Sequence, residues 1–112
     1  MSPADHPYLP VPQTVYWVDT GVLPTPDPER HRAVVVLAAP ATTAGTVAVA
    51  SRSSADGFGV DHPGDVRLGL SAPGTFSRRL PVQAQLWTPA TTAALGRLDD
   101  STFAAVVERF GS

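Results

Sequence analysis

Short runs of β-branched and aromatic residues, separated by proline- and glycine-rich segments, occupy most of the chain. Strands of globular proteins have this composition and length, and the glycines and prolines mark the turns between them. Residues 33–38 form an unbroken apolar run, which is typical of a strand buried on both faces. Strands are accordingly predicted over the following segments: residues 14–18, 33–38, 46–51, 65–70 and 79–87.

The pattern changes near the end of the chain, where apolar residues recur at spacings near three and four, as on one face of an amphipathic helix. This pattern predicts a helix over residues 99–110. Asp99 or Asp100 suits its first position, because a carboxylate accepts hydrogen bonds from the free N–H groups there and favours the helix dipole. A shorter helix is predicted before it, over residues 88–95, since Pro89 suits a first turn and Gly96 suits a helix end.

These elements together predict a mainly β fold. Five or so short strands in a chain of 112 residues usually close into a small barrel or a tightly coiled sheet. The prolines within residues 1–12 remove backbone donors and restrict their neighbours, so this segment is predicted to be a flexible, extended arm. Residues 13–112 are predicted to form one domain, a small barrel with a C-terminal helix and a short helix before it.

Composition narrows the class of protein. Hydrophobic residues make up 43% of the chain and charged residues 16%, which is enough apolar material for one core. There is no cysteine, so neither disulfides nor thiolate metal sites contribute, and a cysteine-free small domain suits the cytoplasm. No apolar run approaches the roughly 20 residues that span a bilayer. A cytoplasmic protein without a membrane partner is therefore expected.

Charge limits the nucleic-acid chemistry that is open to this chain. The formal net charge is −2, which argues against strong non-specific binding of nucleic acid. Any RNA function must rest on a local basic cluster. Two segments offer one: Glu29-Arg30-His31-Arg32 directly precedes the apolar run, and Ser51-Arg52-Ser53-Ser54 ends the next predicted strand. Arginine and hydroxyl groups at strand ends can hold a phosphate, although each segment alone also fits a solvated loop or polar turn.

A hairpin joins the two segments. Residues 33–38 and 46–51 are separated by a short turn region and are predicted to pair as antiparallel neighbours. The start of one strand and the end of its antiparallel neighbour lie at the same edge of a sheet, so Arg32 and Ser53 are predicted to lie close together. The hypothesis is an anion site at a barrel rim, lined by Arg32, Arg52 and Ser53, with Arg30 and His31 beside it.

Other residue types carry weaker signals. The three histidines are scattered without metal-ligand spacing, so no metal site is predicted. Trp17 and Trp87 fit core or rim packing better than base stacking, although a tryptophan at a rim can do both.

Taken in order, several segments resemble the MazF/PemK family of toxins. Val15-Tyr16-Trp17-Val18-Asp19 is similar to the family's opening strand, and Arg32 leading into a valine-rich strand is similar to its second. Ser53 stands where the next strand of the family ends in threonine. Residues 84–88 and 96–100, followed by an amphipathic helix, resemble the rest of the family's pattern, so the likeness runs from about residue 15 to residue 110.

This resemblance implies an SH3-like barrel of the CcdB/MazF type, usually homodimeric, that serves as the toxin of a type II toxin–antitoxin system. Such toxins are sequence-specific endoribonucleases, or mRNA interferases, which need no metal or other cofactor. They cut single-stranded RNA to 2′,3′-cyclic phosphate and 5′-hydroxyl ends, and a cognate antitoxin peptide covers their RNA groove. Arg32 matches the catalytic arginine and Ser53 the catalytic threonine, while Arg30, His31, Arg52 and Gln85 are expected to bind RNA.

Two other functions remain open on the same fold, because a fold does not determine function. One is a CcdB-like toxin that binds DNA gyrase. The other is a catalytically degenerate module that binds an antitoxin-like peptide or another subunit.

Overall fold

The computed structural model describes residues 9–42, 44–54 and 58–111, and within them the fold is mainly β, as predicted. The strands are β1 (Thr14–Asp19), β2 (His31–Ala38), β3 (Thr46–Ser53), β4 (Val60–His62), β5 (Gly74–Gln83) and β6 (Thr92–Arg97). Three single turns of 3-10 helix lie between the strands in the described part of the chain: η2 (Thr20–Val22), η3 (Val66–Leu68) and η4 (Ala84–Leu86). The helix α1 (Asp100–Phe110) ends the chain's regular structure.

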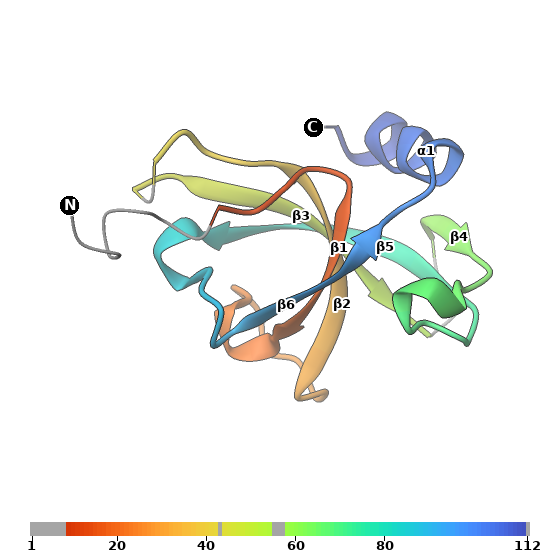
Figure 1. Cartoon of the computed structure of the whole chain (residues 1–112), viewed down its shortest axis with the longest axis horizontal. Helices are drawn as coiled ribbons and strands as arrows, with labels where there is room; N and C mark the ends of the chain where they lie inside the picture. The colour runs from red at the N-terminus through yellow and green to blue at the C-terminus, as the bar shows by residue number, and fades with distance from the viewer. Residues whose placement is uncertain (1–8, 43, 55–57, 112) are drawn as a thin grey trace.

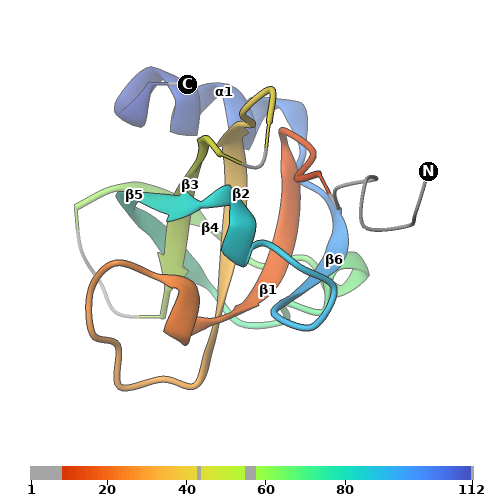
Figure 2. The same ribbon diagram turned by 90° about the vertical axis from the view of Figure 1, so that its left-hand side faces the viewer.

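The strands form one antiparallel sheet in the order β4-β5-β3-β2-β1-β6, which curls into a half-barrel (Figures 1 and 2). The predicted hairpin is confirmed as β2 and β3, which pair with Val34 opposite Ser51. The helix α1 lies over one side of the sheet, while the loop of residues 23–30, which leads into β2, lies on the side away from it (Figure 1). The sheet therefore offers its loop side for a site that the helix does not cover.

Two hydrophobic layers cover the two faces of the sheet, because side chains alternate along each strand. The central strand β2 shows this most clearly, since residues 33–37 are all buried, as the apolar run predicted. Odd-numbered residues of β2 face the layer under α1, which includes Ala50, Phe76, Leu98 and Val106. Val34 and Val36 face the second layer, which includes Val49, Leu80 and Trp87.

The C-terminal helix forms as predicted. The Asp99 carboxylate accepts the backbone N–H of Thr102 at 2.9 Å, and this bond lowers the pKa of Asp99. Val106 is fully buried, with Phe103 and Phe110 packed around the same layer. One apolar stripe and one cap thus attach α1 to the sheet.

Residues 65–70 do not form the predicted strand. The Asp65 side chain accepts the Arg67 N–H at 2.9 Å and so starts the turn η3. Gly69 then takes the left-handed conformation, with φ 72°, and only an isolated bridge joins Asp65 to Leu70. Turn chemistry outweighs the alternation of polar and apolar residues here.

The helix predicted over residues 88–95 is also absent, since β6 begins at Thr92 and pairs with β1. The hydroxyl and backbone N–H of Thr92 both bond to the Thr88 carbonyl, at 2.9 and 3.0 Å, and close a single turn. Residues 92–97 then pair with the edge of β1, whose backbone N–H and C=O groups form hydrogen bonds that favour a strand over a helix. Similarly, β5 starts and ends earlier than predicted, at Gly74 and Gln83.

Most of the predicted N-terminal arm, residues 1–8, lies outside the described residues, as does His6. Of its described part, Pro10 is buried, and the backbone N–H of Val11 donates to the Tyr16 hydroxyl at 3.0 Å. These last residues of the arm are therefore attached to the domain.

Candidate anion-binding site

Strand register brings polar side chains from three neighbouring strands onto the loop side of the sheet. Along β2, Arg32 follows the same alternation as Val34 and Val36 and so faces the second hydrophobic layer. Ser51 pairs with Val34 on one side and with Arg78 on the other. A bulge between β3 and β5 at this point leaves Arg52 opposite Phe76. Arg32, Ser51 and Arg78 therefore share one face at the end of the sheet.

These side chains and the proline-rich loop enclose a cavity of about 180 Å³, here called the rim cavity. Its apolar wall comes from the loop and from Leu80. Its polar residues are Thr25, Asp27, Arg32, Ser51, Ser53, Ser77 and Arg78. The predicted neighbours Arg32 and Ser53 thus meet at one cavity, with a second arginine beside them.

A bidentate ion pair holds Arg32 at the edge of this cavity. Its Nε and Nη2 donate to the two oxygens of Asp27, each at 2.6 Å, and Nη1 lies 3.5 Å from the Arg52 carbonyl. The hydrogen bond to Asp27 raises the pKa of Arg32, and the same bond lowers the pKa of Asp27. Both groups are therefore ionised at neutral pH.

The pair still leaves donors for an anion. A guanidinium has five N–H groups in a planar fork, and Asp27 takes those on the side of Nε. The remaining N–H groups of Nη1 and Nη2 lie together at the end of the fork. Phosphate oxygens accept from such a pair in a bidentate manner. The backbone N–H of Glu29 also donates to Asp27, at 2.9 Å, which fixes the carboxylate on the loop.

Other predicted RNA-binding residues lie elsewhere. Arg52 points to the opposite face, where it is 9% exposed and donates through Nε to His62 Nδ1 at 3.1 Å and through Nη2 to the Ala72 carbonyl at 2.5 Å. It is therefore a buried residue and does not line the rim cavity. Gln85, in η4, bonds to Gln83 at 2.9 Å beyond the far end of β5.

Arg30 and His31 remain near the site but outside it. Both are exposed at the start of β2. The His31 ring stacks on Trp17, with ring centres 5.8 Å apart and planes at 12°. Trp17 pairs with Ala33, so this stack lies on the face opposite Arg32.

Sequence reasoning missed four polar residues of the rim cavity, which are Thr25, Asp27, Ser77 and Arg78. Asp27 precedes the basic cluster by only a few residues, and an acid so near a basic cluster is a signal for pairing. Ser77 and Arg78 reach the cavity only through the pairing of β5 with β3 and its bulge, which no local pattern indicates.

Within the described residues, no group of three or more histidine, aspartate or glutamate side chains is arranged to hold a metal ion, and no helix has the length and apolar character to cross a membrane. No family model, curated protein or solved structure matches this chain.

Proposed function

We propose that this chain is an endoribonuclease that cuts single-stranded RNA without a metal ion, and that it is the toxin of a type II toxin–antitoxin pair. The observation that carries the proposal is the rim cavity, which Arg32, Ser53 and Arg78 line together with the Asp27 carboxylate. Cations and hydroxyl donors around a small cavity suit a phosphodiester. The resemblance described above adds a cognate antitoxin peptide and a second copy of the chain as partners.

In the proposed reaction, the 2′-oxygen of RNA attacks the adjacent phosphorus and the bond from phosphorus to the 5′-oxygen breaks. A 2′,3′-cyclic phosphate and a 5′-hydroxyl result. Arg32 and the Ser53 hydroxyl donate to the phosphoryl oxygens, where negative charge builds up. Because Asp27 raises the pKa of Arg32, this arginine stays charged and acts by electrostatic stabilisation.

Asp27 acts in this proposal by positioning Arg32. Its pKa is lowered chiefly by the hydrogen bond to Arg32, so the carboxylate is ionised, and both of its oxygens accept from the guanidinium. A carboxylate of lowered pKa is a weak base, so water takes the proton of the 2′-hydroxyl, and the departing 5′-oxygen takes up a proton from solvent. Asp27 orients the guanidinium that binds the phosphate.

The test is cleavage of a long single-stranded RNA by the purified protein in EDTA, with mass spectrometry of the new ends. Removing one donor of this kind costs about 10²–10³ in rate, so Arg32→Ala and Ser53→Ala should each lose that much. Arg67→Ala is the matched control, because Arg67 is exposed and pairs with Asp65 outside the rim cavity. No cleavage by the wild type, or equal cleavage by Arg32→Ala, would overturn the proposal.

One observation favours a second candidate, a catalytically silent interaction module of the same fold. Asp27 occupies one side of the Arg32 fork with two short hydrogen bonds, which neutralises the charge that RNA would meet. This candidate predicts no growth arrest when the protein is expressed. The ribonuclease predicts an arrest that Arg32→Ala relieves.

A further inference from the structure

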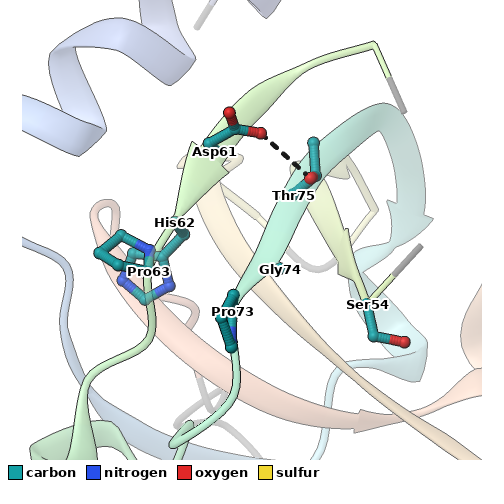
Figure 3. Close-up of a pocket in the computed structure, with 7 residues that line it drawn as sticks. All are labelled: Ser54, Asp61, His62, Pro63, Pro73, Gly74 and Thr75. Carbon is teal, nitrogen blue, oxygen red and sulfur yellow. Dashed lines mark hydrogen bonds between the residues drawn. The ribbon is translucent and has the colours of Figure 1, made fainter. Parts of the chain in front are cut away.

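A second cavity, of about 340 Å³, opens at the same end of the sheet, where β3 and β4 end and β5 begins (Figure 3). Its polar groups come from Ser54, Asp61, His62 and Thr75, and Pro63 and Pro73 add apolar wall. This volume lies at the lower end of the range for small-molecule sites. It is here called the end cavity.

The end cavity adjoins the rim cavity. Ser53 lines the rim cavity and its neighbour Ser54 lines the end cavity. Ser53 also pairs across the strands with Thr75, and Thr75 pairs with Asp61. Adjacent strands lie about 4.8 Å apart, so Asp61 is roughly 10 Å from Ser53 along the sheet. A nucleotide next to a phosphate held at Ser53 can therefore place its base in the end cavity.

Asp61 gives the end cavity a hydrogen-bond acceptor. Its Oδ1 accepts from the Thr75 hydroxyl at 3.3 Å, which directs the carboxylate across the two strands (Figure 3). Asp61 forms no ion pair among the described residues, so no arginine or histidine of this part of the chain pairs with its second oxygen. An ionised carboxylate only accepts hydrogen bonds. It suits the amino group of cytosine or adenine and disfavours the carbonyl that uracil presents at the corresponding position.

One wall of the end cavity is held in place by a buried pair. Arg52 Nε–H donates to His62 Nδ1, which leaves His62 neutral with its proton on Nε2. Gly74 lies directly against this pair, since a Cβ at this position would come within 2.7 Å of Arg52 Cζ. A wall fixed in this way keeps the shape of the cavity, and a fixed shape helps to select one ligand over another.

We infer that the end cavity is the base-binding subsite for the nucleotide beside the cleaved bond, and that Asp61 makes it prefer an amino-bearing base over uracil. The inference rests on the proposed function, because a phosphate bound in the rim cavity sets the distance. Cytosine and uracil are the matched pair that tests it, since uracil has a carbonyl in place of the amino group of cytosine and an N–H in place of its acceptor nitrogen at ring position 3.

The experiment measures fluorescence anisotropy of labelled five-nucleotide strands of deoxycytidine and of deoxyuridine, which lack the 2′-hydroxyl and cannot be cut. The wild type should bind the cytosine strand about tenfold more tightly. Asp61→Asn should bring the ratio close to one, because its amide can also donate to uracil. Asp61 is exposed, so this variant keeps the fold. Glu108→Gln, on α1, removes the same charge elsewhere and should keep the preference.

Equal binding of the two strands by the wild type, absence of binding, or a preference that survives in Asp61→Asn would each overturn the inference. RNA cleavage is scored separately. If RNA is cleaved but the preference for cytosine does not depend on Asp61, the base-binding subsite is wrong and the ribonuclease proposal stands. A preference that depends on Asp61 without any cleavage defeats the ribonuclease and leaves a single-stranded nucleic-acid subsite in place.

Discussion

The ion pair between Asp27 and Arg32 should couple the proline-rich loop to the sheet energetically. The perturbation is a double-mutant cycle of Asp27→Ala, Arg32→Ala and the double variant. Because both hydrogen bonds are short and join opposite charges, they belong to the strong class of protein hydrogen bonds. The cycle isolates the pairwise energy from the other contacts of each residue.

Burial sets the expected magnitude. The side chains of Arg32 and Asp27 are 18% and 12% exposed, so solvent screens the pair only in part. Breaking a fully buried pair costs about 3–5 kcal/mol, whereas exposed pairs contribute at most about 1 kcal/mol. A coupling of about 2 kcal/mol is expected between these limits. As the pKa of Asp27 is lowered, this stabilisation is present above the unfolded value of 3.8 and is lost as pH falls through the lower folded value.

Urea unfolding at pH 7, followed by tryptophan fluorescence, gives the four free energies of unfolding. The pair Arg67–Asp65 is the internal comparison, because the Arg67 side chain is 79% exposed, and its cycle should show little coupling. A coupling for Asp27 and Arg32 no larger than that of the exposed pair would refute the reasoning. The guanidinium would then be free of the loop in solution.

Two further predictions concern the buried pair behind the end cavity. Burial, and then the Arg52 charge, hold the pKa of His62 below 6.5, so the free energy of unfolding should fall as the pH drops from about 6.5 towards the folded pKa. His62→Gln should remove this pH dependence, as measured by urea unfolding at a series of pH values. A pH dependence that persists in this variant would contradict the prediction. Gly74→Ala places a methyl group 2.7 Å from Arg52 Cζ and 2.8 Å from the Ser53 carbonyl, and should cost about 1–3 kcal/mol in the same assay. An unchanged urea midpoint for Gly74→Ala would show that the strand can move away from Arg52.

Local sequence patterns were sufficient to predict the elements whose signals lie within their own residues. The buried run of β2 and the capped, amphipathic α1 carry their own signals, and both formed where predicted. The proximity of Arg32 and Ser53 was predicted from the antiparallel pairing of two strands in one hairpin, and both residues line the rim cavity.

The predictions that were wrong concern residues whose structure depends on pairing with segments far away in the sequence. Residues 92–97 have helix-compatible alanines, but the free edge of β1 turns them into a strand. Arg52 was grouped with the anion site because of its neighbours, yet alternation sends it to His62 on the other face. The face to which a side chain points at a strand end depends on the register of the strand with its neighbours, and a single local segment does not determine that register.

The bulge between β3 and β5 decides which side chains of β5 face the rim cavity. Its extra residue is Ser77, which lies between Arg78, facing the rim cavity, and Phe76, fully buried in the layer under α1. If Ser77 paired in a regular ladder, it would stand opposite Arg52, and Phe76 would stand opposite Ser53 and turn towards the rim cavity. Thr75 would then turn to the face under α1. Deleting the codon for Ser77 should instead leave Arg78 and Phe76 on their present faces, because it removes only the extra residue and the two neighbours that remain alternate.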